Sequence, residues 1–451
     1  MWSKIAKDKE FTSKLTKIAV PVMLQHLITN GLNTLDTFMI TKLGTNSVAG
    51  VGLANQAFFF FSFILFGINT GSSILFAQYY GAGEEDRIKK TLGYAMKFSV
   101  LVSIIFNLFA FFKPEWFIKV FIDDSGVINE GAKYLRLVSF SYILTALSFS
   151  IGFAMRSTDN PKAPFVASFI SFFVNAFFNY CFIFGKFGMP RMGVRGAAIG
   201  TIIARFIEFL VLIYVLKKYK GPCYDKFCNY FKCDVKFRKQ FLKVITPVVI
   251  EESLWSLAQV VYSGIYAKIG VDATAGIQVA QSVSNLLYVV ARGLSSAAAV
   301  IIGVKIGEGD YDRAQDIAMK SLVVGATFGA ILGAVLIIFP SELLKLFPDL
   351  TYDVRELSRT ALMAMGLTYP IRMHNSVGIV GVLRGGGDVK YSMTLETICS
   401  WLVGIPLGMI AVGVFHVPLW AAILFTTSDE LVKMIVSQPR MRKGLWIKNY
   451  S

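Results

Sequence analysis

Charged residues are scarce in this chain, and so is histidine. Of its 451 residues only 16% are charged and three are histidine, whereas soluble domains average about 25% charged residues. The sequence has no GxxxxGK[ST] phosphate loop, no HExxH metal motif and no GxSxG nucleophile motif. These absences argue against a soluble protein, a built-in ATPase and a hydrolase, so we expect a protein that is not an enzyme and needs no cofactor.

Apolar length takes the place of charge. The chain is 55% hydrophobic, and runs of about 20 apolar residues, enough to cross a bilayer as a helix, recur along it. The basic N-terminus leads directly into the first run, so we expect no cleaved signal peptide. The sequence predicts an all-α integral membrane protein with twelve spans, over 16–40, 47–78, 91–112, 130–155, 163–184, 196–216, 240–267, 273–304, 315–340, 355–383, 389–413 and 417–437.

The net charge of +16 has two readings, nucleic-acid binding and loops held on the cytoplasmic side. With the N-terminus inside, Lys and Arg are concentrated in the loops on that same side, as the positive-inside rule requires. We therefore expect both termini in the cytoplasm, contacts with membrane lipids and no nucleic-acid partner.

A basic, aromatic-rich segment over 217–239 is the clearest change of composition. We expect it to be a cytoplasmic linker between an N-terminal six-helix lobe (1–216) and a C-terminal six-helix lobe (240–451). Cys223, Cys228 and Cys233 lie in it, where cytoplasmic cysteines should stay reduced. Metal binding by these three is the alternative, although their spacing is not that of a CxxC zinc site.

An internal repeat supports the two lobes. At an offset of 226, Pro21 matches Pro247 and Gly44 matches Gly270, and at 228 Arg156 matches Arg384. Because six spans per lobe is an even number, the two copies enter the membrane from the same side and are related by a pseudo-twofold axis along its normal. Such an architecture suits alternating access and predicts a secondary transporter.

Polar residues in the first span are spaced as one helical stripe: Gln25, Thr29, Asn33 and Asp36. Placing a carboxylate at membrane depth costs roughly 2.5–3.5 kcal/mol of insertion free energy. We therefore take such a residue as a candidate for a functional site. Asn175, Asn179 and Thr201 could complete an oxygen cluster with Asp36. Such a cluster suits sodium, and Asp36 could instead carry a proton. We expect no other metal site.

The seventh span carries a similar stripe with acids and aromatic rings, a surface suited to organic cations. The alternative is that these side chains hold the helix bundle together. The residues we single out there are Glu251, Glu252, Gln259, Tyr262 and Tyr266.

Other ionisable residues lie within predicted spans. Arg205 and Glu208 are three residues apart and should pair. Glu396 is a candidate acid for the second lobe, whereas Asp429 and Glu430 fit a helix end. For His26 and His374, packing is a better interpretation than proton relay.

Together these segments resemble the multidrug and toxic compound extrusion (MATE) transporters over essentially the whole chain. The resembling segments are Pro21 with Leu35–Gly44, Pro247–Trp255, Gly307–Gly309, Leu383–Asp388, and Asn175 with Asn179–Gly185 and Gly193–Thr201.

The resemblance implies a sodium- or proton-coupled antiporter that exports amphiphilic, often cationic, organic compounds along a path between two lobes arranged as a V. It implies that Asp36 is the coupling acid, that Asn175 neighbours it, and that Glu252 is the seventh-span acid. Asn179 departs from the aspartate that many relatives carry. The tenth span has no acid in Pro370–Asn375, where some relatives have an aspartate. We also expect a monomer in a bacterial plasma (inner) membrane.

A flippase for lipid-linked saccharides is the alternative function. Such a protein needs a cationic cavity for pyrophosphate, to which Lys97, Arg292 and Arg372 could contribute. The motifs fit the exporters better.

Overall fold

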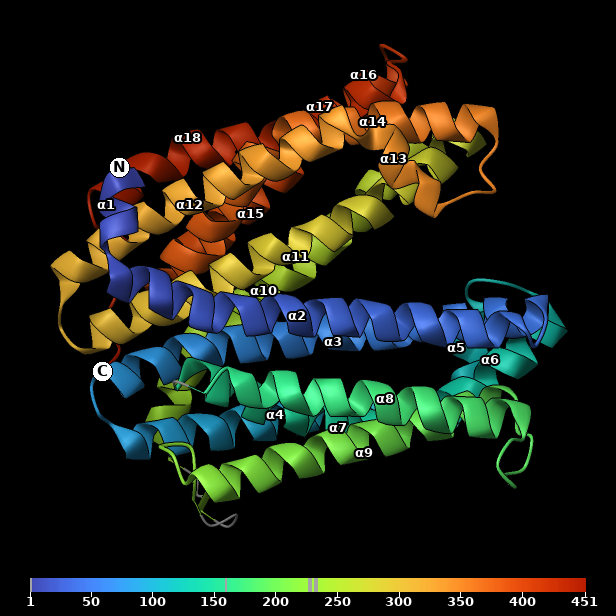
Figure 1. Ribbon diagram of the computed structural model, residues 1–451, viewed down its shortest axis with the longest axis horizontal. Helices are drawn as coiled ribbons and strands as arrows, with labels where there is room; N and C mark the ends of the chain where they lie inside the picture. Colours follow the sequence, from blue (N-terminus) through green and yellow to red (C-terminus); the bar gives the residue numbers. More distant parts are fainter. Residues whose placement is uncertain (1, 159, 226–228, 231–233) are drawn as a thin grey trace. The chain divides into compact units, whose positions relative to one another are not determined.

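The computed structural model describes residues 2–158, 160–225, 229–230 and 234–451, and in these ranges the chain is helical without strands (Figure 1). The first half contains α1 (Trp2–Lys7), α2 (Lys9–Thr41), α3 (Thr45–Gly81), α4 (Glu85–Phe112), α5 (Pro114–Lys119), α6 (Ser125–Val138), α7 (Ser141–Ser157), α8 (Lys162–Phe184) and α9 (Val194–Tyr219). The second half contains α10 (Val235–Ala267), α11 (Val271–Gly307), α12 (Tyr311–Ile338), α13 (Pro340–Leu343), η2 (Leu344–Leu346), α14 (Tyr352–Asn375), η3 (Ser376–Arg384), α15 (Val389–Cys399), η4 (Ser400–Gly404), α16 (Ile405–Gly413), α17 (Leu419–Thr426) and α18 (Ser428–Arg442).

The predicted all-α membrane fold with twelve spans is confirmed. Eight helices of the described chain are long and apolar enough to span by themselves, and the α6–α7 pair makes a ninth. Helix α2, the α14–η3 segment and the α17–α18 segment account for the rest. These three carry more polar and charged residues, and all three contribute to the clusters described below.

Four predicted spans are not single α-helices. The span over 389–413 consists of α15, the π-helix η4 and α16 in succession. The span over 130–155 is α6 and α7, which bend by 48° at their junction. The span over 355–383 continues from α14 into the π-helix η3, and 417–437 is divided between α17 and α18. A π-turn shifts the register of a helix face and often marks a functional site; here η3 ends at Arg384.

Two compact units emerge from the packing. The N-terminal unit comprises Leu24–Phe76 and Gly83–Val249, and the C-terminal unit comprises Met1–Met23, Ala77–Ala82 and Ile250–Ser451. Helix α9 ends at Tyr219 and α10 begins at Val235, so both helices extend into the segment predicted as linker. The division into lobes at 217–239 stays a prediction.

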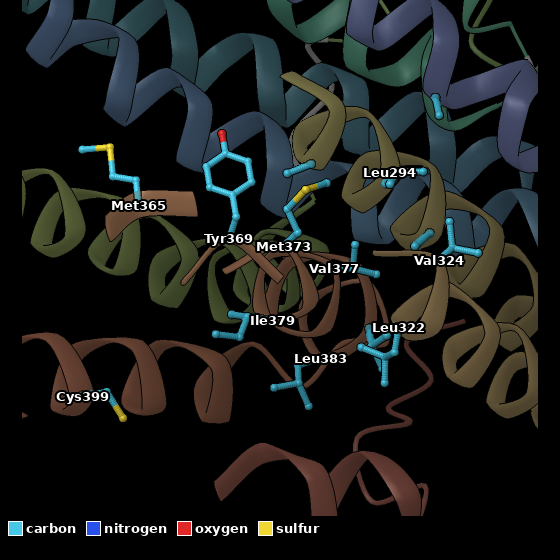
Figure 2. Close-up of a cluster of buried hydrophobic side chains, with 14 of the residues drawn as sticks. Leu294, Leu322, Val324, Met365, Tyr369, Met373, Val377, Ile379, Leu383 and Cys399 are labelled. Carbon is cyan, nitrogen blue, oxygen red and sulfur yellow. The ribbon is translucent and has the colours of Figure 1, made fainter. Parts of the chain in front are cut away.

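In the C-terminal unit, α12 packs along α14 through glycines one turn apart. A Cβ at Gly329 would meet the backbone of Tyr369 and Pro370, and one at Gly333 would meet the carbonyl of Gly366. Small residues at this spacing let membrane helices approach closely. The buried side chains of Met365, Tyr369, Met373 and Val377 then fill the space beside α11 and α12 (Figure 2).

In the N-terminal unit, α8 and α9 lie side by side, and α9 also packs on α6 and α7 (Figure 1). Gly196 of α9 faces the backbone of Phe182, and Ala197 and Ala204 are buried on the same helix. This row of small residues brings α9 against the polar residues of α8, which positions the candidate site.

Candidate functional site

Asp36 belongs to a hydrogen-bonded cluster in the N-terminal unit. Asn179 Nδ2 donates to Asp36 Oδ1 at 2.7 Å and to Asn175 Oδ1 at 3.0 Å. Asn175 Nδ2 donates to Thr201 Oγ1 at 3.3 Å. The structure therefore brings together the four residues for which the sequence predicted a common oxygen cluster.

Helix spacing and a glycine position this cluster. Asn175 and Asn179 lie one turn apart on α8 and are 1% and 0% exposed. A Cβ at Gly200 of α9 would collide with Asn179 Oδ1, so only glycine lets α9 come this close. Tyr134 of α6 is buried close to Thr201 and Asp36 and covers the cluster.

One acceptor in this cluster is unused. Asn179 Oδ1 is buried and has no hydrogen-bond partner within the described chain. Buried polar atoms without partners are rare and call for an explanation, such as an ion that is not present. Together with Asp36, Asn175 and Thr201 it forms a set of oxygens of the kind that hard cations prefer.

Of the other residues in the first-helix stripe, one is hydrogen-bonded to neighbouring helices and two are exposed. Gln25 Oε1 accepts from Arg156 Nη2 at 2.6 Å, and Gln25 Nε2 donates to Ser168 Oγ at 3.1 Å. Thr29 and Asn33 are exposed. Gln25 thus helps to hold α2, α7 and α8 together, whereas Thr29 and Asn33 leave their side chains accessible.

Arg205 and Glu208 pair as predicted, with Nη1 and Oε2 2.7 Å apart. Glu208 Oε1 also accepts from Ser168 Oγ at 2.8 Å. Because Ser168 accepts from Gln25, the pair is joined to Arg156 through a chain of hydrogen bonds.

In the C-terminal unit, Glu251 and Glu252 share one guanidinium. Arg384 Nη2 lies 2.8 Å from Glu251 Oε1, and Arg384 Nη1 lies 2.6 Å from Glu252 Oε1. Ser392 Oγ donates to Glu251 Oε1 at 2.9 Å. Arg384 lies directly before the turn at 385–387 and is the counter-ion of both acids.

A signal for this contact was present in the repeat. Arg156 and Arg384 are repeat counterparts, and Gln25 and Glu251 are counterparts at the offset of 226. In each unit the arginine reaches the matching position of the leading helix. Because Arg156 contacts Gln25, the repeat would have predicted that Arg384 contacts Glu251.

The remaining seventh-span residues are not one surface. Tyr266 is buried, and its hydroxyl lies 2.6 Å from Thr426 Oγ1. Tyr262 donates to the Ser400 carbonyl at 3.4 Å. Gln259 is exposed, so it differs from the two tyrosines, which join α10 to α17 and η4.

A second charged cluster was largely missed. Lys433 Nζ lies 2.9 Å from Glu396 Oε1, 2.9 Å from Asp429 Oδ2 and 3.4 Å from Glu430 Oε1. Asp429 and Glu430 are at the start of α18, as expected for a helix end, yet Asp429 is buried. The i,i+4 spacing of Asp429 and Lys433 was the available signal.

Other candidates have local partners. Arg372 stacks on Tyr288 and Tyr369, at 5.5 and 6.0 Å from the ring centres, and His374 Nε2 lies 2.8 Å from Gln438 Nε2. Lys97 lies over the Tyr94 ring at 4.8 Å. Arg292 is exposed.

Among the cysteines of the basic segment, Cys223 is buried against Thr158 Oγ1 at 3.3 Å and is in no disulfide. Cys228 and Cys233 lie outside the described residues. The suggested metal site of these three cysteines therefore stays untested.

Comparison with known proteins identifies the family. A sequence model of the MatE family matches residues 21–181 and 247–410, one match for each copy of the repeat. The chain is 25% identical to a probable multidrug resistance protein NorM of Thermotoga maritima over 453 residues, covering 97% of this chain and 94% of that protein. It is 26% identical to the probable multidrug resistance protein YoeA of Bacillus subtilis over 394 residues, covering 87% and 85%.

Solved structures agree in fold. A crystal structure of MATE in complex with MaL6 superposes with a TM-score of 0.87 at 16% identity, covering 95% of both chains. A MOP superfamily transporter from Pyrococcus furiosus superposes with a TM-score of 0.84 at 17% identity, covering 96% of both. The expected resemblance is confirmed: this chain belongs to the MatE family and is a multi-span membrane transporter, not an enzyme.

Proposed function

We propose that this transporter exports small amphiphilic organic compounds, often cationic, in exchange for sodium ions or protons that enter through alternating access. Membership of the MatE family and the multidrug resistance names of its relatives support this function. The observation that carries it is the cluster of Asp36, Asn175, Asn179 and Thr201.

The cluster suits an ion that binds and leaves. Its one carboxylate is held by a neutral amide at 2.7 Å, so a bound cation or proton can compensate its charge. Arg205 lies within electrostatic range of Asp36 but pairs with Glu208. Asp36 is thus the coupling acid, with the other three residues as its ligands or hydrogen-bond partners.

In the C-terminal unit, Glu252 and Glu251 are the acids of this function. Gln259, with its exposed side chain, is the seventh-span residue best placed to meet a substrate, and Tyr262 and Tyr266 support the helix behind it. In the first helix, Thr29 and Asn33 are the accessible polar residues, and Gln25 supports them.

The test is uptake of a fluorescent organic cation into inverted proteoliposomes, under a sodium gradient or a proton gradient imposed separately. Asp36→Asn should lower gradient-driven transport on the order of tenfold or more, because it removes the charge that the ion compensates. Asp86→Asn is the matched control, since the Asp86 side chain is 94% exposed. Full transport by Asp36→Asn under both gradients would refute the assignment.

We also propose a monomer in the bacterial plasma membrane, with the lobes 1–216 and 240–451 joined at 217–239 and both termini in the cytoplasm. The basic loops on the side of the termini support this orientation. Labelling of single cysteines placed at residues 2 and 451 with an impermeant reagent should succeed in inverted vesicles and fail in intact cells. The opposite pattern would reverse the orientation.

A further inference from the structure

The Lys433 cage, defined as Lys433 with Glu396, Asp429 and Glu430, is a buried charged cluster of the C-terminal unit that the proposed function leaves unused. Lys433 is 2% exposed, although an ammonium in a membrane helix is costly unless it is paired. Three carboxylates from two helices surround it within 3.4 Å. Its ammonium occupies the place that a small cation would take in such a cage.

Helices packed around the cage add polar and charged groups. Asn375 of α14 donates to Glu430 Oε2 at 2.8 Å, and Ser400 of η4 donates to Asp429 Oδ2 at 3.3 Å. Other titratable groups that interact electrostatically with members of the cage are Arg372 of α14, Cys399 of α15, and Glu251, Tyr262 and Tyr266 of α10.

The charges of this region do not balance. Glu251, Glu252, Glu396, Asp429 and Glu430 are matched only by Arg384, Lys433 and Arg372 among the groups just described. Moreover, Glu251 Oε2 is buried and lacks a hydrogen-bond partner in the described chain, while Oε1 of the same carboxylate accepts from Ser392. A buried carboxylate oxygen without a donor is a place where a proton can bind.

With Lys433 among them, these groups do not form a site for a metal ion. No set of three His, Cys, Asp or Glu side chains within 2–158, 160–225, 229–230 and 234–451 could hold one. With Lys433 Nζ at the centre of the cage, its carboxylates point to the ammonium and not to an empty space. The excess negative charge is then relieved by protons.

We propose that Lys433 is a tethered cation: it fills the carboxylate cage in place of a diffusible ion, so the C-terminal unit exchanges protons and does not bind sodium. This inference rests on the proposed cation coupling and names the proton as the coupling ion in the C-terminal unit. It predicts that removal of the ammonium converts the cage into a sodium site.

The experiment uses the full chain in detergent with Asp36→Asn, so that the cluster of the N-terminal unit does not contribute. Binding is measured by equilibrium dialysis of radioactive sodium and by the sodium-dependent rise in Tm. We expect no sodium binding with Asp36→Asn alone and about one ion per chain after Lys433→Met is added, since one ammonium is replaced by one ion. Adding Glu396→Gln should abolish this gain.

Lys320→Met in the same background is the matched control. Lys320 is also a buried lysine between two carboxylates, those of Asp8 and Asp316. Because Asp316 is 45% exposed, water can replace the lost ammonium there, and no sodium binding is expected.

Two results would overturn the proposal. The first is that the Asp36→Asn protein, with Lys433 intact, binds sodium and loses this binding when Glu396→Gln is added. The second is that the Asp36→Asn/Lys433→Met protein folds but binds no sodium. If Lys433→Met does not fold, potentiometric titration of Asp36→Asn with and without Glu396→Gln decides: the proposal requires fewer protons taken up between pH 8 and 5 when Glu396 is replaced. Equal uptake would refute it. The transport assay on Asp36→Asn alone tests the proposed function, so the two can fail separately.

Discussion

The two units place an arginine at the same position of the repeat and give it different partners. In the N-terminal unit Arg156 donates to the neutral amide of Gln25. In the C-terminal unit Arg384 pairs with two carboxylates, Glu251 and Glu252. One geometry of the fold therefore serves as a structural hydrogen bond in one unit and as a buried ion pair in the other.

A second pair of cations at corresponding positions also differs in its partners. The offset of 228 that relates Arg156 to Arg384 also relates Arg205 to Lys433. Arg205 pairs with one acid, Glu208, whereas Lys433 contacts three. In the N-terminal unit the acid of the first helix, Asp36, is hydrogen-bonded to the amide of Asn179, whereas the C-terminal unit supplies fixed cations to its acids. The difference is consistent with a division of ion chemistry between the two units.

Removing the arginines separately gives the largest expected difference. Arg384→Met leaves the buried carboxylate of Glu251 and the partly buried one of Glu252 without their counter-ion. It should cost about 3–5 kcal/mol of stability, the range for breaking one side of a buried ion pair. Arg156→Met leaves a neutral amide and should cost about 1–3 kcal/mol. The Tm of each variant in detergent measures this. Equal losses would mean that the charges of Glu251 and Glu252 do not distinguish the units.

The glycine beside Asn179 is the next test. Gly200→Ala should push α9 away from α8 and cost about 1–3 kcal/mol, as overpacking does, and it should also lower transport, since it displaces Asn179 from Asp36. Gly52→Ala is the control, because a Cβ there meets nothing within 4 Å. Should Gly200→Ala transport as the parent does, the exact position of Asn179 is not required for coupling.

Tyr266 and Gln259 separate support from substrate contact in the seventh span. Tyr266→Phe removes the hydrogen bond to Thr426 and should lower stability by about 1 kcal/mol with transport unchanged. Gln259→Ala, at an exposed position, should change stability by less than about 0.5 kcal/mol and alter the apparent affinity for substrate. A reversed pattern would make Tyr266 the substrate residue. Thermal unfolding and concentration-dependent transport provide the two readouts.

The smallest expected effect is on stability at acidic pH, through Asp8. The guanidinium of Arg313, with Lys320, holds the pKa of Asp8 well below its ordinary value of 3.8. A lowered folded-state pKa means that Asp8 contributes stability above pH 3.8 and loses that contribution as the pH falls toward its folded pKa. The Tm of Asp8→Asn should therefore decline less than that of the parent between pH 5 and 3. An identical decline would show that Asp8 is not the group responsible.

Much of the architecture could be predicted from the sequence because it depends on local patterns. Apolar run length indicated the spans, and the repeat indicated two related halves. The turn spacing of Asn175 and Asn179 put both amides on one face of α8, and the i,i+3 spacing of Arg205 and Glu208 was enough to pair them.

Only the tertiary structure decided which acids are paired with a cation of the protein and which are not. Arg384 is 132 residues from Glu252 in the chain, and no local period relates them. Lys433 meets Glu396 only because α15 and α18 pack together, and Tyr266 is buried because Thr426 comes to lie beside it. Helical spacing determines which side chains share a face, but the packing of whole helices determines which charges that face meets.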